Sequence, residues 1–137
     1  MNKGESVLKL HRVSFSDVNY KRNTDIAFPE ETPYNMTFTR EIFSAVVDEK
    51  GTEMYKVALS ALIESTDENK SVQLQIRVNG YFECVCEDEK TKETLLNQNA
   101  VAILFPYLRS QISLVTTQPD MRPITLQAFN ISTLFSE

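Results

Sequence analysis

The stretch from Val72 to Cys86 alternates apolar and polar residues over a length that suits one long β-strand. Its apolar phase holds every second residue: Val72, Leu74, Ile76, Val78, Gly80, Phe82, Cys84 and Cys86. Successive side chains of a strand point to opposite faces of a sheet, so this pattern predicts a strand with one buried face. Gly80 takes the place of a side chain on that face, which predicts a bend or the close approach of another element.

A second alternating stretch lies upstream, with the apolar residues Tyr55, Val57, Leu59, Ala61 and Ile63. Between the two stretches, the sequence STDENK supplies polar residues that favour a turn. The two predicted strands should therefore pair as an antiparallel hairpin.

Two further strands are predicted nearer the N-terminus, and both lose their alternation part of the way along. In residues 34–47 the apolar phase changes between Phe38 and Phe43, and in residues 8–20 it changes after Leu10 and again after Phe15. A β-bulge adds one residue to a strand and shifts its phase, so we expect bulges at these places. Four antiparallel strands are thus predicted before any helix.

From about residue 90 the apolar spacing changes to three and four residues, which is the period of an α-helix. The helical stripe consists of Val101, Leu104, Phe105, Leu108, Ile112 and Val115. Strands first and a helix last predict an α+β fold, with a four-stranded antiparallel sheet followed by one long helix. The length of 137 residues suits one domain, and no linker or repeat divides it, so we expect a single domain over residues 1–137.

The predicted helix also has apolar residues away from its main stripe, namely Ile103, Tyr107 and Leu114. One sheet and one helix offer these side chains no partner within a single protomer. The sequence therefore predicts self-association, to a dimer at least.

Charge and hydropathy exclude several classes of partner. The net charge of −5 argues against nucleic acid or an anionic membrane, because binding to phosphate needs clustered Lys and Arg. No apolar run approaches the roughly 20 residues that span a bilayer. The first residues lack the apolar region of a secretory signal, so we expect a cytoplasmic protein without membrane insertion.

Few side chains could carry chemistry. Cys84 and Cys86 lie two apart on one strand face, where a mutual disulfide is geometrically poor, so we expect free, partly buried thiols. His11 stands at no recognisable spacing from a nucleophile, and the scattered glycines form no phosphate-binding loop. A structural zinc needs four ligands, which this His and Cys pair do not supply within one chain. We therefore expect no enzymatic activity, no catalytic residue, no metal and no cofactor.

The C-terminal part of the sequence resembles a known family. Residues 103–109, ILFPYLR, fit an Ile-Leu-Phe-Pro-Tyr-x-Arg motif in order. Asn130, Leu134 and Phe135 fit an Asn-Phe-x-x-Leu-Phe ending, with Ile131 in place of the aromatic residue. Together these motifs resemble the C-terminal signature of the SecB family of protein-export chaperones. Residues 8–20, 55–65 and 76–83 resemble the family's first, third and fourth strands more loosely.

The resemblance implies a fold and a function. The family has a four-stranded antiparallel sheet with two helices and assembles as a homotetramer, a dimer of dimers. Its members hold unfolded chains in apolar grooves without ATP and pass exported precursors to the SecA motor. Aromatic grooves accept varied unfolded segments. We expect the peptide-binding groove to be lined by Phe82, Phe105, Tyr107, Leu126, Phe129 and Phe135.

The same resemblance places Pro106 at the start of the main helix, where a missing backbone donor costs nothing. We therefore expect the regular helix from Pro106 onward, after an irregular or helical lead-in over residues 93–105. After Asn130 we expect a second, C-terminal helix of about seven residues, too short to be stable without packing.

The acidic patch to which the family binds SecA is matched at Asp17, whereas Lys21 and Gln75 stand where two further acids are expected. One carboxylate beside cations builds no attractive acidic field, so we expect weak or absent binding of the SecA tail. Glu64 or Glu83 could rebuild the patch in a shifted place. These departures leave open a second function, that of a dedicated SecB-like partner protein which shields, for example, an antitoxin.

Overall fold

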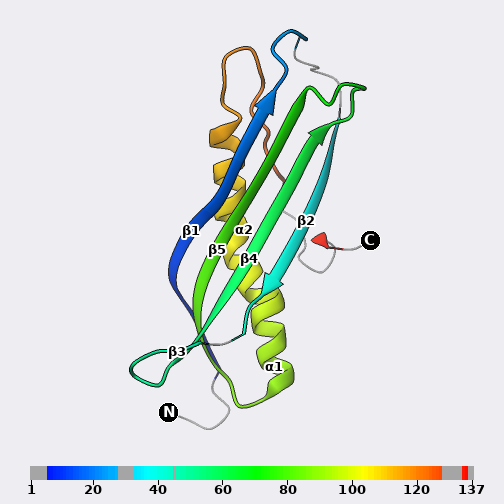
Figure 1. Cartoon of the computed structure of the whole chain (residues 1–137). Coiled ribbons are helices and arrows are strands. Elements are labelled where there is room, and N and C mark those ends of the chain that lie inside the picture. The colour runs from blue at the N-terminus through cyan, green and yellow to red at the C-terminus, as the bar shows by residue number, and fades with distance from the viewer. Residues whose placement is uncertain (1–5, 28–32, 45, 128–133, 136–137) are drawn as a thin grey trace.

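The computed structural model describes residues 6–27, 33–44, 46–127 and 134–135. It shows a curved antiparallel sheet with a long helical segment packed against it (Figure 1). The sheet order is β1-β5-β4-β2, and β3 also pairs with β4. The strands are β1 (Val7–Arg22), β2 (Tyr34–Ile42), β3 (Val46–Val47), β4 (Glu53–Ser65) and β5 (Val72–Val85). The helical segment consists of α1 (Glu89–Thr94), a π-helical turn (Leu95–Asn99) and α2 (Ala100–Val115). The predicted α+β order is confirmed.

The predicted hairpin is formed by β4 and β5, with Val57 opposite Gly80. Its turn is organised by the carboxylate of Asp67, which accepts hydrogen bonds from the Ser65 hydroxyl at 2.5 Å and from the Ser71 backbone N–H at 3.1 Å. These bonds hold the pKa of Asp67 below its ordinary value, the bond from Ser65 being the largest cause.

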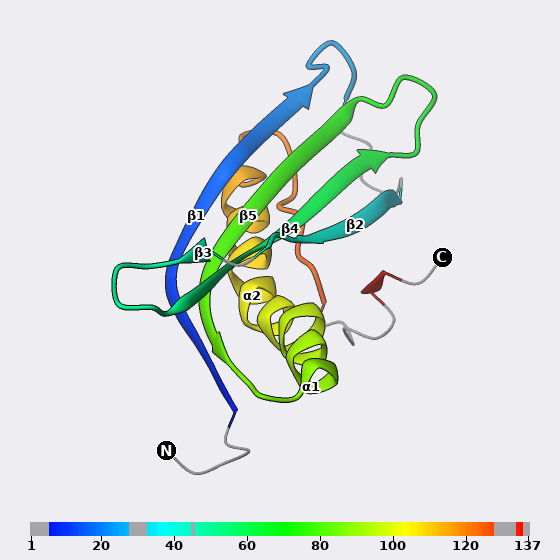
Figure 2. The ribbon, with the colours of Figure 1, turned by 60° about the horizontal axis from the view of Figure 1, so that its bottom comes forward.

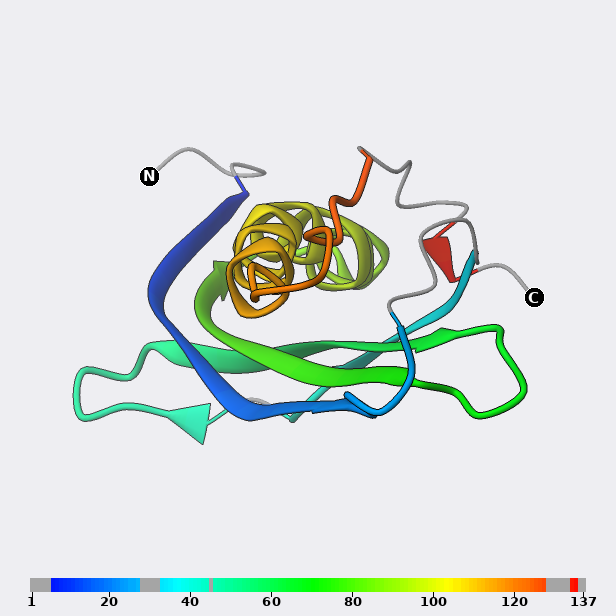
Figure 3. The ribbon, with the colours of Figure 1, turned by 90° about the horizontal axis from the view of Figure 1, so that it is seen from above.

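The first strand has the two predicted changes of phase. β1 pairs with β5 along its length, and its register shifts between Leu10 and Arg12 and again between Phe15 and Asp17. Bulges increase the local twist of a strand. Seen from above, β1 curves round toward the side on which α2 lies (Figure 3).

The predicted second strand is divided in two. β2 ends at Ile42, and β3 resumes at Val46, opposite Met54 of β4. Three residues, 43–45, separate Ile42 from Val46, whereas only residues 55 and 56 separate their partners on β4, so the pairing contains the one extra residue of the bulge that we expected. β2 and β3 therefore pair with consecutive parts of the longer strand β4, one residue out of register with each other.

The helices lie on one side of the sheet (Figure 3), and the described residues place no helix on the opposite side. The predicted apolar phase of β5 faces α2. Five residues of the helical stripe face this strand and are buried, namely Val101, Leu104, Phe105, Leu108 and Ile112. A Cβ added to Gly80 would lie 2.6 Å from Leu104 Cδ2. The element that approaches Gly80 closely is therefore α2, as the pattern predicted.

The helical segment begins well before Pro106. Asp88 caps α1 by accepting the Thr91 backbone N–H at 3.3 Å, and α2 itself begins at Ala100 and continues through Pro106. The expectation that Pro106 begins the main helix was wrong. Pro106 and Ala102, four residues earlier, are both exposed, so the carbonyl that loses its intrahelical donor can be hydrated.

In the described part of the chain, no helix is long and apolar enough to cross a membrane. The predicted helix after Asn130 falls mostly on residues outside the described ranges. Leu134 and Phe135 are described, and both are partly buried against the core.

Candidate functional site

After α2 the chain turns back, and residues 122–127 form an arm beside the helix (Figure 2). The backbone N–H of Ile124 donates to Thr116 Oγ1 at 2.8 Å, and the Ile124 carbonyl accepts from Ser113 Oγ at 3.1 Å. Ile124 and Leu126 are buried, whereas Thr125 between them is exposed. The arm thus packs as an extended chain does, with alternate side chains turned inward.

The loop before the arm is held by the end of β1. Arg22 donates to the Asp120 carbonyl at 2.6 Å and to its carboxylate at 3.2 Å. The Tyr20 hydroxyl donates to the Met121 sulfur at 3.0 Å. Burial raises the pKa of Tyr20, so its hydroxyl stays protonated and able to donate. The arm is therefore fixed at its start by contacts from the opposite layer.

Aromatic residues from β2 and α2 also meet between the sheet and the helix. The rings of Phe38 and Phe105 lie 6.2 Å apart at 57°. Arg40 of β2 donates to the Asn97 carbonyl at 2.6 Å and lies 4.4 Å from the centre of the Phe135 ring. Aromatic rings and the Arg40 cation therefore lie together where β2 faces the π-helical turn and α2.

The predicted groove residues are not all accessible within one protomer. Phe82 is 0% exposed between the sheet and α2, and Phe105 and Leu126 are also buried. Tyr107 is 45% exposed, Phe135 is partly buried, and Phe129 lies outside the described residues. Within one protomer, three of the five described residues therefore belong to the core, and the groove over all six residues stays a prediction.

The second face of α2 is exposed as predicted. Leu114 is 67% exposed, and Ile103 and Tyr107 lie on the same stripe of the helix. Beside Leu114, a hollow of about 580 Å³ opens between the end of α2 and the arm, where Leu126 also lines it. The described part of α2 therefore presents three exposed apolar side chains, and polar residues such as Ser110 and Ser113 line the hollow together with Leu114.

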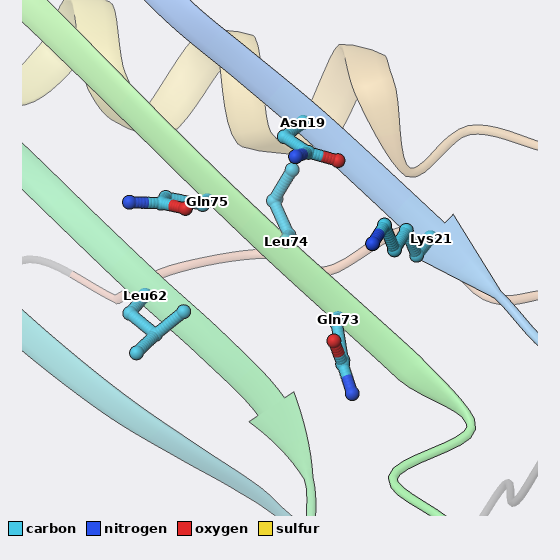
Figure 4. A pocket seen from close by; sticks show the side chains of 6 residues that line it. All are labelled: Asn19, Lys21, Leu62, Gln73, Leu74 and Gln75. Carbon is cyan, nitrogen blue, oxygen red and sulfur yellow. The ribbon is translucent and has the colours of Figure 1, made fainter.

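The surface around Asp17 carries few acids. Asp17 lies opposite Arg77, and Arg77 forms an ion pair with Glu41 at 3.2 Å. Nearby, a hollow of about 130 Å³ is lined by the side chains shown in Figure 4, none of which is a carboxylate. Lys21 and Gln75 are among them. The described residues at the expected SecA-docking patch thus give it little negative charge.

His11, Cys84 and Cys86 are the described side chains that the sequence singled out for possible chemistry. His11 lies 3.0 Å from Glu83, and both are accessible to solvent on the strands. Burial raises the pKa of the Cys84 thiol, so it stays protonated, and Cys86 is likewise a free thiol. Among the described His, Cys, Asp and Glu residues, no group of three or more is placed to hold a metal.

Sequence reasoning missed a second apolar pocket, of about 650 Å³, lined by β1, the β2–β3 region, β4 and β5. Its lining includes Arg12, Phe43, Val46, Met54, Lys56 and Tyr81. Tyr81 lies opposite Arg12 and Lys56, in the phase of β5 that points away from α2, so the pocket opens on the helix-free face. A large side chain in the polar phase of a predicted strand, such as Tyr81 in residues 72–86, was the signal that could have indicated this pocket.

Comparison with known proteins identifies the family. The family model described as preprotein translocase subunit SecB matches residues 13–137. The protein-export protein SecB of Anaplasma phagocytophilum is 29% identical over 119 residues, which cover 78% of this chain and 75% of that protein. An uncharacterised protein of Methanocaldococcus jannaschii is 37% identical over 70 residues, half of this chain, and the match spans 45% of that protein.

Two solved structures share the fold. The SecB-like chaperone of Mycobacterium tuberculosis, in complex with a ChAD peptide from the HigA1 antitoxin, covers 90% of this chain and 91% of its own at a TM-score of 0.72 and 14% identity. A protein of unknown function from Streptococcus agalactiae covers 90% of this chain and 99% of its own at a TM-score of 0.52 and 12% identity. Because the family match extends over most of the sequence, the chain belongs to the SecB family.

Proposed function

We propose that this protein is an ATP-independent holdase that binds unfolded polypeptide segments on the surface formed by α2 and the arm. The observation that carries the proposal is that the protein packs a stretch of its own extended chain there, with Ile124 and Leu126 inward and Thr125 outward. Unfolded clients present the same alternation along an extended backbone. Apolar contacts are non-directional, so they accept clients of varied sequence.

Family membership supports this proposal. The relative from A. phagocytophilum is named for protein export, and the M. tuberculosis chaperone with the same fold was solved with an antitoxin peptide. These relatives support polypeptide clients, a chaperone role without enzymatic activity, and a cytoplasmic setting.

The six proposed contact residues have different parts in client binding. Tyr107 is open to a client directly, and Phe135 is half-accessible beside Arg40. Phe105 and Leu126 form the floor and become contacts when a client displaces side chains above them. Phe82 supports α2 from the sheet side, and Phe129 remains a proposed contact from the sequence pattern.

We also propose that the C-terminal end of the exposed stripe of α2, at Leu114, is covered by self-association into a dimer of dimers, which leaves Tyr107 open to a client. Leu114, at 67% exposure, has the most apolar surface to gain from such burial. Light scattering at micromolar concentration should give the mass of a dimer or a tetramer, and Leu114→Asp should lower it. A wild-type monomer under these conditions would contradict the assembly.

The holdase activity can be tested with an aggregating client and a matched pair of variants. Purified protein at near-stoichiometric amounts should suppress the light scattering of a refolding client. Tyr107→Ser should weaken suppression, whereas Leu62→Ser, which removes a similarly exposed side chain from the helix-free face, should not. Measuring the mass of both variants separates lost assembly from lost client binding. No suppression at about tenfold excess of the wild type would refute the proposal.

A dedicated partner-binding role is the second candidate, and the weakly acidic surface around Asp17 favours it. Such a surface is a poor docking site for a basic tail. Calorimetry with the SecA tail peptide should detect no binding tighter than about 10 μM. Micromolar or tighter binding that Asp17→Ala abolishes would instead assign the protein to export. A native pull-down then separates many unfolded clients from one stoichiometric partner.

A further inference from the structure

The apolar pocket on the helix-free face is separate from the surface formed by α2 and the arm. Its volume of about 650 Å³ lies within the range of about 300–1,000 Å³ that is typical of ligand sites. The sheet stands between it and α2, since Tyr81 points away from the helix and its neighbour Phe82 points toward it. An inference about this pocket therefore does not depend on the proposed holdase activity.

Two cations lie over aromatic rings of the pocket. The Arg12 guanidinium is 4.2 Å from the centre of the Tyr81 ring, and Lys56 Nζ is 4.7 Å from the centre of the Phe43 ring. Neither cation forms an ion pair with a described carboxylate. A cation stacked on a ring keeps its charge available to an incoming anion.

The charge of this pocket is opposite in sign to that of the whole protein. None of its lining residues is acidic, although the chain has a net charge of −5. The nearby carboxylates are already engaged, Glu83 by His11 at 3.0 Å and Glu41 by Arg77 at 3.2 Å. The pocket therefore combines an apolar interior with two cations free to bind carboxylates.

A free strand edge borders the pocket. Val46 lines it, and Val46 and Val47 of β3 are 69% and 61% exposed. In the described residues, β3 pairs with β4 on one side and with no strand on the other. The backbone groups of such an edge can pair with an added extended chain. A small molecule would use the pocket but not this edge.

We propose that this pocket and the β3 edge bind an extended peptide segment of a partner protein, with a large apolar side chain flanked by carboxylates. The apolar side chain enters between Phe43, Met54 and Tyr81, the carboxylates meet Arg12 and Lys56, and the backbone pairs with β3. This partner class has the charge that the pocket selects and the extended shape that the edge requires. The site thus gives the protein a specific partner contact besides any client surface.

The proposal can be tested by calorimetry on the full chain with the capped peptide Gly-Asp-Glu-Phe-Glu-Asp-Gly. Two matched peptides separate the contributions: one has Lys at the four acidic positions, and the other has Ser in place of Phe. N-acetylphenylalanine serves as the small-molecule probe. At low ionic strength the acidic Phe peptide should bind at least about tenfold more tightly than each of these three probes.

Charge reversal in the protein locates the binding. Arg12→Glu and Lys56→Glu should each weaken the acidic peptide about tenfold, whereas Lys21→Glu, the same type of change at the other end of this face, should leave affinity within about twofold. Circular dichroism and thermal unfolding of all three variants confirm that they are folded.

Several results would overturn the proposal. No binding of the acidic peptide at about 1 mM, or equal binding of the lysine peptide, removes the charge selection. Equal binding of N-acetylphenylalanine assigns the pocket to small acids, and an equal effect of Lys21→Glu places the peptide elsewhere. If the wild type does not bind the peptide and the Arg12→Glu variant has a lower mass in solution than the wild type, the face is assigned to a second copy of this chain. These binding results can be interpreted even if the holdase assay fails, because the pocket is separate from the surface formed by α2 and the arm.

Discussion

Replacing Gly80 by Ala tests how closely α2 packs on the sheet. Gly80 lies in the middle of β5, opposite Val13 of β1 and Val57 of β4, on the face toward the helix. Its added Cβ would lie 2.6 Å from both Leu104 Cδ2 and Phe82 Cε2. Both side chains are fully buried, so neither can move into solvent to relieve the contact.

The size of the effect follows from two opposing contributions. An extra methyl group in a packed core costs about 1–3 kcal/mol. Replacing glycine by alanine also restricts the unfolded chain, which stabilises the fold by about 0.4–1 kcal/mol where the backbone allows it. We therefore expect Gly80→Ala to lower the free energy of unfolding by about 1–2 kcal/mol. Leu104→Ala alone should cost about 2–5 kcal/mol through lost burial and the cavity it leaves.

The double variant distinguishes this contact from a general loss of packing. Leu104→Ala removes one of the two side chains that crowd the new Cβ and leaves a cavity into which the Phe82 ring can shift, so Gly80→Ala should become nearly neutral in that background. The expected coupling is about 1–2 kcal/mol in a double-mutant cycle of urea unfolding at fixed protein concentration. Strictly additive costs, or a neutral Gly80→Ala in the wild type, would show that the close approach of α2 is not what requires glycine here.

Three further predictions address the helix, the arm and the hairpin turn. Pro106→Ala should stabilise the fold by about 1 kcal/mol, because it restores a helix donor, and a lower urea midpoint would contradict this. Thr116→Val should cost about 1–3 kcal/mol, because it leaves the buried Ile124 N–H unpaired, with Thr117→Val as the exposed control. The lowered pKa of Asp67 contributes stability that is present above its unfolded pKa and is lost as pH falls through its folded pKa. Asp67→Asn should therefore lower the melting temperature at neutral pH and reduce its drop on acidification; an unchanged drop would assign the acid sensitivity to other groups.

The sequence by itself determined which residues form the strands and which face of each is buried. Alternation in β4 and β5 is a local property of the chain, and both strands bury the predicted phase. The changes of phase after Leu10 and Phe15 likewise marked real bulges. The glycine in the apolar phase was informative for the same reason, since a missing side chain on a buried face implies that a neighbour fills the space.

Elements whose form depends on a distant partner were not determined in this way. Local residues predicted the extra residue between β2 and β3, but not that regular pairing stops at Ile42 and resumes at Val46, because this depends on how each part pairs along β4. The position of Pro106 inside α2 also depends on tertiary contacts. A proline favours the start of a helix, yet an exposed position and the packing of the opposite helical face on the sheet keep it inside α2.

The candidate site depended most on tertiary structure. An apolar residue reads the same in sequence whether it is buried or open, so Phe82, Phe105 and Leu126 could not be separated from the accessible Tyr107. Only the packing of α2 and the arm decides which side chains reach solvent. The pocket on the helix-free face shows the same effect over longer distances, since its lining comes from segments that span residues 11–81 and meet only when the sheet has formed.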